Sequence, residues 1–391
     1  MSGDRNTVIL FLNHWARRMG GAEHSLMDML TFMHDKCACH IATAEEGRLT
    51  EKAGKIGVAV HVVPCRASLE RIRRWGLLKS LLIFRREGVA FFRFVVRLKK
   101  TVDKIKPHLI HANVPKSHVA LFLLRLLGYN GICCFHLREI FGEHSAAMGL
   151  YRLLFPRRRG YIIAISRAVK NALPPRLRSK TTVLYNGVTC VASRESRQRN
   201  QGLKLLYLGR VVPWKGCHTL VDIFKILKEK YPSETITLSL TGDTLYWSDR
   251  YRGELEQRIL RYNLSSSCVL SPHTDNPETV YLAHDVFCNA SLNEPFGRVV
   301  AEAQGCGLPV VAFNSGGIPE IVVHNETGLL VHPGDNEGFA EAISTFITHP
   351  EIKQSMGDRG RERTMRFFNK AIQIPRIYSF LIEKSGLQDE F

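Results

Sequence analysis

The most informative stretch of the chain, residues 293–322, reads NEPFGRVVAEAQGCGLPVVAFNSGGIPEIV. It predicts a helix that starts near Pro295, an apolar strand at 308–313, and a second Gly-rich turn before another helix. Pro295 suits the first turn of a helix, because the N–H that proline lacks would have no partner there. The free N–H groups and the positive dipole end of such a helix attract anions. The stretch therefore predicts an anion site at the end of a strand.

Two carboxylates accompany this predicted anion site. Glu294 precedes the helix and lies at the mouth of the site, whereas Glu302 lies about two turns deeper. The ordinary alternative for Glu302 is an ion pair with Arg298 at the i, i+4 spacing of a helix. Two glutamates at this spacing carry little information by themselves.

A basic loop lies upstream in the same half of the chain. Residues 206–216 read LYLGRVVPWKG, which predicts a strand followed by a loop with Arg210 and Lys215. An arginine and a lysine on one strand-to-helix loop can clamp a diphosphate and stabilise its charge as it leaves. A solvated loop is the ordinary alternative for the basic pair taken alone.

Apolar strands and helices alternate along the chain. The predicted strands are 8–14, 39–44, 58–63, 108–113, 131–137, 161–166, 203–210, 236–242, 267–272, 285–291 and 308–313. Such strands favour parallel sheets that are covered on both faces, in an α/β fold. We expect two Rossmann-like, doubly wound domains at 1–188 and 203–366, joined by a polar linker at 189–202. Residues 367–391 predict a C-terminal helical segment, whose core need not be the nearest one.

Together these motifs resemble the donor site of retaining glycosyltransferases of family 4 (glycosyl transferases group 1), which have the GT-B fold. That fold places two Rossmann-like domains on either side of a cleft. The family patterns E-P-F-G-x-x-x-x-E-A, G-x-P-V-V, G-G-x-x-E and G-R-x-x-x-x-K-G match residues 294–303, 307–311, 316–320 and 209–216. Weaker matches are Gly-Gly-Ala-Glu at 20–23, His136, Ser166 and Asn186-Gly187-Val188. The likeness covers nearly the whole chain.

The resemblance implies a catalytic set of Arg210, Lys215, Glu294 and His136. Arg210 and Lys215 would bind the donor diphosphate, and Glu294 would bind the sugar. His136 would lie over the transferring sugar and contact its hydroxyls. The ordinary alternative for His136 is a buried, hydrogen-bonded histidine at a strand end.

The resemblance also implies a donor-binding set. Its members are Gly20, Gly21, Gly209, Phe296, Gly297, Arg298, Val299, Glu302, Gly316 and Gly317. Glu302 would bind the ribose hydroxyls, and Phe296 and Gly297 would offer backbone N–H groups. Gly20 and Gly21 would let the N-terminal domain close on the phosphates. Pro272-His273 replaces a glycine that many relatives have near the nucleobase, so the base stays open.

No two aspartates stand two residues apart, so the metal-chelating D-x-D pattern of the other glycosyltransferase fold is missing. We therefore expect neither a metal nor another cofactor. Fixed cations and a helix dipole would stabilise the leaving diphosphate instead. By the resemblance the anomeric configuration is retained through front-face attack, so the glutamates are not the carboxylate pair of a glycosidase.

Positive charge is concentrated in the first half of the chain. Residues 1–190 contain 32 Lys+Arg and 12 Asp+Glu, a net charge of +20, whereas residues 191–391 contain 22 and 24, a net charge of −2. Residues 66–106 alone contain 13 Lys+Arg, 3 acidic residues and five Trp or Phe. This pattern favours an anionic membrane surface or a phosphorylated substrate, with a solvated amphipathic helix pair as the ordinary alternative. Without a recognisable nucleic-acid motif, we expect no nucleic-acid partner.

The start of the chain lacks a signal-peptide cleavage site, and no uncharged apolar run approaches the roughly 20 residues of a membrane span. We therefore expect a cytoplasmic protein, peripheral at the cytoplasmic face of the membrane. Its predicted function is metal-independent, retaining hexosyl transfer from a UDP- or GDP-linked donor. The predicted acceptor is membrane-linked or anionic, in surface polysaccharide or glycolipid synthesis. One alternative is a non-catalytic GT-B protein that binds a nucleotide sugar or acts as a scaffold for a partner. Another is a different GT-B chemistry, such as sugar epimerisation or phosphorolysis.

Overall fold

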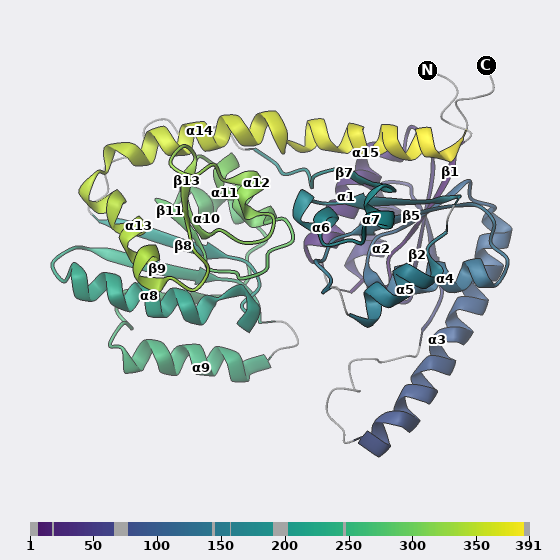
Figure 1. Cartoon of the computed structure of the whole chain (residues 1–391), viewed down its shortest axis with the longest axis horizontal. Helices are drawn as coiled ribbons and strands as arrows, with labels where there is room; N and C mark the ends of the chain where they lie inside the picture. The colour runs from purple at the N-terminus through teal and green to yellow at the C-terminus, as the bar shows by residue number, and fades with distance from the viewer. Residues whose placement is uncertain are drawn as a thin grey trace. The chain divides into compact units, whose positions relative to one another are not determined.

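The computed structural model describes residues 7–17, 19–65, 77–142, 145–156, 158–190, 202–244 and 248–386, with the helical backbone alone for residues 77–85 and 248–249. The chain divides into two compact units. Unit 1 consists of Met1–Ile165, Lys170–Leu184 and Gln373–Phe391, and unit 2 of Ser166–Val169 and Tyr185–Ile372. Each unit is a parallel sheet covered by helices, as Figure 1 shows. The predicted α/β class and the two Rossmann-like sheets are confirmed.

Unit 1 has a seven-stranded sheet in the order β3-β2-β1-β4-β5-β6-β7. The strands are β1 (Val8–Leu12), β2 (Ala38–Thr43), β3 (Ala59–Val62), β4 (Leu109–Ala112), β5 (Ile132–Leu137), β6 (Gly160–Ala164) and β7 (Thr181–Val183). All neighbouring strands pair in parallel. The order reverses beside β1, which pairs with both β2 and β4, and such a switch point is where open α/β sheets bind ligands.

The helices of unit 1 are α1 (Gly21–Met33), α2 (Arg48–Lys55), α3 (Leu77–Ile105), α4 (Pro115–Leu126), α5 (Ala146–Leu154), α7 (Pro175–Arg178) and most of α15 (Lys370–Ser385). The short α6 (Arg167–Asn171) is divided between the two units. The apolar face of α15 belongs to the core of unit 1. Ile377 and Leu381 are fully buried in one cluster with Ile9 and Phe11 of β1 and Leu30 of α1. The C-terminal helix α15 thus completes the hydrophobic core around β1, the first strand of the chain.

Unit 2 has a six-stranded parallel sheet in the order β10-β9-β8-β11-β12-β13. Its strands are β8 (Leu203–Leu208), β9 (Ile236–Thr241), β10 (Cys268–Ser271), β11 (Val286–Asn289), β12 (Val310–Phe313) and β13 (Gly328–Val331). Its helices are η3 (Pro213–Lys215), α8 (Cys217–Lys230), α9 (Ser248–Arg261), α10 (Pro277–Leu282), α11 (Arg298–Gly305), α12 (Ile318–Ile321), α13 (Asn336–Thr348) and α14 (Glu351–Phe367). The inner strands β11 and β12 are buried along their whole length, as a sheet covered on both faces requires.

The predicted strands correspond to strands of the structure, with ends that differ by at most two residues. The short strands β7 and β13 were not predicted. Most of the predicted linker, residues 191–201, lies outside the described residues, as do residues 66–76 of the basic stretch 66–106. Within the described ranges, no helix has the length and hydropathy that crossing a membrane requires.

Four histidines are buried inside unit 1, and one of them is His136 of β5. His111 of β4 and His118 of α4 have almost no exposed surface, and His14 follows β1. Burial lowers the pKa of His111 and His118 to about 3 and that of His14 to about 4. The folded chain therefore keeps these imidazoles neutral at a pH where the unfolded chain protonates them.

We predict that the free energy of unfolding of unit 1 falls as the pH drops from about 6.5 toward 4. The unfolded chain takes up protons in this window and the folded chain does not, so each histidine costs about 2 kcal/mol at pH 5. Urea unfolding at a series of pH values measures the slope. His118→Gln should flatten it, and His34→Gln, at an exposed position of the same unit, should not. A stability that stays constant between pH 7 and pH 5 would contradict the prediction.

Candidate functional site

Three loops meet at the carboxyl edge of the unit 2 sheet. They follow β8, β11 and β12, which lie side by side in the sheet. Parallel neighbours end at the same edge, so the loops 209–216, 290–297 and 314–317 come together there. The predicted anion site and the predicted basic loop are thus adjacent in unit 2.

An ion pair joins two of these loops. The Lys215 ammonium at the end of η3 donates to the carboxylate of Glu294, which lies between β11 and α11. The two side chains are only 16% and 9% exposed. Removing charged groups from water costs free energy. The buried ammonium of Lys215 and the buried carboxylate of Glu294 therefore each need a partner, which is either the other member of the pair or a ligand that takes its place. The pair concentrates a cation and a carboxylate at one point of the loop cluster.

Glycines allow the loops to approach each other closely. Gly316 has a φ of +58°, and a Cβ there would lie 2.1 Å from the carbonyl oxygen of Glu294. A Cβ on Gly317 would lie 2.6 Å from the carbonyl oxygen of Pro295, and the Gly317 N–H donates to the Glu294 carbonyl at 2.7 Å. Gly216 approaches Ala290 in the same way. Gly316 and Gly317 therefore shape the backbone around Glu294.

The helix after Glu294 starts later than predicted. The sequence predicted a start near Pro295, but α11 begins at Arg298. The cause is Gly297, whose φ of +97° is left-handed and cannot continue a right-handed helix. The first backbone N–H groups of a helix have no acceptor within that helix, so the start of α11, with Val299, offers donors to an anion. The Phe296 ring is buried against Phe368, so only its backbone can meet a ligand.

Glu302 is held from two sides. The Arg298 Nε donates to its Oε1 at 2.8 Å, and the Tyr281 hydroxyl of α10 donates to its Oε2 at 3.1 Å. Burial raises the pKa of Tyr281 well above its ordinary value, so the hydroxyl keeps its proton. The i, i+4 pair considered from the sequence is therefore present. Tyr281 was missed, because no motif distinguishes it from a core tyrosine.

Glu320, the last residue of the G-G-x-x-E motif, caps a helix. Its carboxylate accepts the backbone N–H groups of Arg167 and Ala168 at 2.8 Å each and the Tyr185 hydroxyl at 3.0 Å. The Ser166 hydroxyl donates to the Pro295 carbonyl at 2.5 Å. These bonds hold the segment Ser166–Val169 in unit 2, next to the loop that carries Glu294.

Gly209 and Arg210 directly follow β8. Gly209 has a φ of +153° at the point where the chain leaves the strand. Arg210, the next residue, is exposed. The Tyr207 hydroxyl donates to the Arg210 carbonyl at 2.7 Å and fixes the backbone below the guanidinium. Arg210 and Lys215 thus lie on one loop as predicted, with only Lys215 in an ion pair to a carboxylate among the described side chains.

The predicted site residues of unit 1 are Gly20 and Gly21 at the start of α1 and His136 in β5. Gly20 is the N-cap of α1, its N–H donates to Glu23 Oε2 at 3.0 Å, and Gly21 is the first residue of that helix. His136 lies inside β5 and has no exposed surface. His111 Nε2 is 3.0 Å and Arg138 Nη2 is 3.3 Å from His136 Nδ1, and burial holds the His136 pKa well below its ordinary value. Its contact with a sugar stays a prediction that requires the imidazole to become exposed.

A polar network links the ends of β1, β4 and β5. Arg138 Nε donates to Asn113 Oδ1 at 3.0 Å, and Asn113 Nδ2 donates to Asn13 Oδ1 at 2.9 Å. Asn113 also donates to the Ala22 carbonyl at 3.2 Å, which anchors the first turn of α1. No sequence motif distinguishes these side chains, although each follows directly on a strand.

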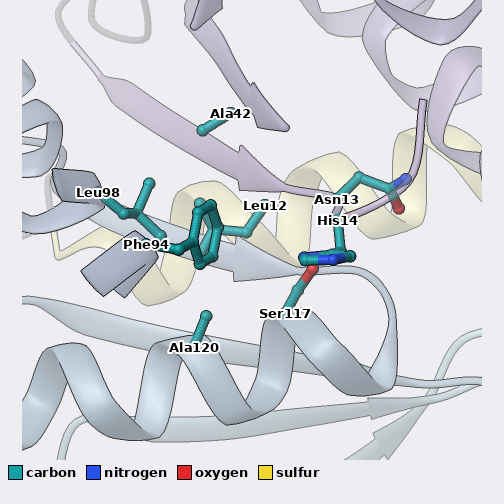
Figure 2. A pocket seen from close by; sticks show the side chains of 8 residues that line it. All are labelled: Leu12, Asn13, His14, Ala42, Phe94, Leu98, Ser117 and Ala120. Atoms are coloured by element: carbon teal, nitrogen blue, oxygen red, sulfur yellow. The ribbon is translucent and has the colours of Figure 1, made fainter. Parts of the chain in front are cut away.

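A pocket beside this network is too small for a sugar. Its volume is about 10 Å³, room for a single water. Its lining residues are Leu12, Asn13, His14, Ala42, Phe94, Leu98, Ser117 and Ala120. Figure 2 shows Phe94 and Leu98 of α3 beside Leu12 of β1 and Ala120 of α4. The pocket lies where α3 packs against β1 and α4.

Among the described residues, no group of three or more His, Cys, Asp or Glu side chains is arranged to hold a metal ion.

Comparison with known proteins covers both halves of the chain. Residues 19–191 match the model of Glycosyltransferase Family 4, and residues 192–363 match that of Glycosyl transferases group 1. The capsular polysaccharide biosynthesis glycosyltransferase CapM of Staphylococcus aureus is 25% identical over 373 residues, 89% of this chain and 91% of CapM. The glycogen synthase of Mycobacterium tuberculosis is 29% identical over 304 residues, 72% of this chain and 70% of the synthase. The crystal structure of Anabaena HepE in complex with UDP and glucose is similar with a TM-score of 0.78 and 25% identity, over 96% of this chain and 99% of HepE.

We predict that Gly316→Ala destabilises unit 2 far more than Gly334→Ala. Both glycines have a positive φ, of +58° and +88°, so each substitution costs about 1–2 kcal/mol of backbone strain. Nothing lies within 4 Å of a Cβ at Gly334, whereas one at Gly316 would meet Glu294. The displaced loop should add roughly 2 kcal/mol or more. Urea unfolding measures both variants, and equal losses of stability would show that the close approach does not matter.

Proposed function

Because the chain belongs to the GT-B glycosyltransferases of family 4 and group 1, we propose that it transfers a sugar from a nucleoside diphosphate donor with retention of configuration and without a metal ion. The solved structures of HepE contain UDP, UDP with glucose, or UDP-glucose, which supports a UDP-linked sugar as the donor here. The GDP-linked donor is the alternative.

The Lys215–Glu294 ion pair carries this proposal. It lies on the loops after β8 and β11, beside the N-terminus of α11. A donor diphosphate bound there replaces the carboxylate as the partner of Lys215, and Arg210 on the same loop adds a second cation. Glu294 is then free to accept hydrogen bonds from hydroxyls of the sugar. The site thus exchanges one anion for another, which avoids leaving a buried ammonium without a counter-charge.

Glu302 suits the ribose, because its carboxylate is held in a fixed orientation. Arg298 and the Tyr281 hydroxyl occupy one position on each of its oxygens. A carboxylate oxygen can accept a further hydrogen bond, so both remain able to bind the hydroxyls of a ribose. Orientation before binding reduces the entropy that binding has to overcome.

The transfer step needs little covalent chemistry from the protein. The acceptor oxygen forms a bond to the anomeric carbon on the face from which the diphosphate leaves, and the bond from that carbon to the phosphate oxygen breaks. The proton of the acceptor hydroxyl passes to the departing phosphate. Arg210, Lys215 and the N-terminus of α11 stabilise the negative charge that develops on the diphosphate.

The acceptor we propose is a glycan or a lipid-linked sugar in the synthesis of a surface polysaccharide or glycolipid. CapM, which resembles the chain over nearly its whole length, is named for capsular polysaccharide biosynthesis. The net charge of +20 in residues 1–190 suits an acceptor that is anionic or lies at an anionic membrane surface. Such an enzyme would work at the cytoplasmic face of the membrane.

We predict that Arg210→Ala and Lys215→Ala each lower kcat by roughly 10²–10³, or about 3–4 kcal/mol, because each removes a cation aimed at the leaving diphosphate. Release of UDP or GDP from a panel of nucleotide sugars measures turnover. Lys225→Ala serves as the matched control, since it removes a cation of α8 whose ion pair, with Glu229, lies at the surface. Circular dichroism should show an intact fold in all three. Near-wild-type turnover of both site variants would refute the assignment.

We predict that turnover survives EDTA. The chain lacks a D-x-D pattern, and the proposed site neutralises the diphosphate with fixed cations instead. Donor turnover is measured before and after chelation, and again after Mg²⁺ or Mn²⁺ is added back. Loss of activity with EDTA and its return with either ion would show that the metal-free mechanism is wrong.

A further inference from the structure

Helix α3 has two faces of different character. Phe91, Phe94, Val95, Leu98 and Val102 are buried, and they attach the helix to unit 1. The His14 ring meets Phe94 edge-on with 5.6 Å between centroids, which fixes this side of the helix near the end of β1. Hydrophobic burial therefore explains one face of α3 completely.

The opposite face is exposed and yet partly apolar. Val89 and Phe92 are each 46% exposed, and Val96 is 38% exposed. Spacings of three and four residues place them in one stripe along the helix. Single exposed apolar residues are ordinary on a protein surface. A stripe of three on a helix whose other face is already packed favours an interaction surface.

Cations border this stripe. Arg86, Arg93, Arg97 and Lys100 are exposed, and their spacing places them in a second stripe next to the first. Lys99 forms a surface ion pair with Asp103 at 2.5 Å. Residues 86–104 contain six Lys or Arg against two acidic residues, Glu87 and Asp103. The outer face of α3, meaning Arg86, Val89, Phe92, Arg93, Val96 and Arg97, is thus apolar along one edge and cationic along the other.

We propose that the outer face of α3 docks unit 1 on an anionic lipid bilayer. Val89, Phe92 and Val96 enter the boundary between headgroups and acyl chains, and the cationic edge contacts the lipid phosphates. The arrangement fits a bilayer because a helix that lies in its surface needs apolar and cationic side chains together. The amino-terminal part of α3 extends away from the sheet of unit 1 (Figure 1). The side chains of the outer face are all exposed.

Charge argues against two other occupants. A second copy of the chain with the same face presented would bring one set of cations against another. A nucleic acid would pair with the cations but leave the apolar stripe in water. The inference deepens the proposed function, which places the acceptor at a membrane, but docking itself requires no sugar transfer.

The test is co-sedimentation with vesicles of phosphatidylcholine alone and of phosphatidylcholine mixed with phosphatidylglycerol. We expect wild-type protein to bind the anionic vesicles only, and high salt to weaken binding without abolishing it, since screening leaves the apolar contacts intact. Arg93→Glu with Arg97→Glu should lower the partition coefficient by at least roughly 25-fold, because each cation near the surface is worth about fivefold. Phe92→Ser with Val96→Ser should lower it by about tenfold.

The matched control is Leu260→Ser with Arg261→Glu on α9 of unit 2. Leu260 is 68% exposed and Arg261 is exposed, so this variant removes the same kinds of side chain from another helix. It should bind anionic vesicles as the wild type does, because both positions lie outside the outer face of α3. Thermal unfolding verifies that every variant is folded, since exposed positions should change stability little.

Insertion can be observed directly with Phe92→Trp. Its fluorescence, after the spectrum of the wild type is subtracted, should shift to the blue on anionic vesicles and be quenched by brominated acyl chains. Leu260→Trp should show neither effect. No vesicle binding by the wild type, equal binding by all variants, or an unshifted difference spectrum of the Phe92→Trp variant would overturn the proposal. A dimer or an RNA complex that the outer-face variants abolish, without vesicle binding, would also overturn it.

The same preparations separate docking from catalysis. Hydrolysis of the nucleotide sugar, measured without vesicles, should be unchanged in the outer-face variants, since none of these residues belongs to the proposed donor site. Vesicle binding without donor turnover would refute the proposed function and leave docking standing. Donor turnover without vesicle binding would do the reverse.

Discussion

Glu294 can reach Lys215 only because glycines on the neighbouring loops let three backbones pack against one another. A side chain at Gly316 would collide with the carbonyl oxygen of Glu294. The Gly317 N–H accordingly donates to that same carbonyl. Gly216, which follows Lys215 directly, approaches Ala290 as closely. The position of the ion pair thus depends on residues that carry no functional group.

Close packing of this kind also explains how the loops bring charge together. The strands β8, β11 and β12 are neighbours and end at one edge, and helix α11 starts there with its N–H groups directed toward the loops. An ammonium, a carboxylate and a helix dipole then act within a small volume. A diphosphate fits this combination, because it can take over the role that Glu294 has toward Lys215.

The strand ends of unit 1 carry different side chains from those of unit 2. A hydrogen-bonded network there joins the amides of Asn13 and Asn113 to the guanidinium of Arg138. The nearby His111 and His136 are buried, and burial lowers their pKa, so they are uncharged at neutral pH. The large positive charge of this half therefore comes from Lys and Arg, and part of it lies on the outer face of α3. One helix thereby combines a core face toward unit 1 with a surface face suited to lipid.

The amino-acid sequence by itself determined the two parallel sheets, since continuous apolar strands separated by helices require burial on both faces. It also determined the family, because the spacing of Arg210 and Lys215 is one local pattern and that of Glu294 and Glu302 is another. Only the tertiary structure decided that Lys215 pairs with Glu294, which is 79 residues away. Likewise it decided that Tyr281 orients Glu302, that Gly297 delays the start of α11, and that His136 has no exposed surface. These facts depend on backbone angles and on contacts between distant segments, and no local pattern of residue types specifies either.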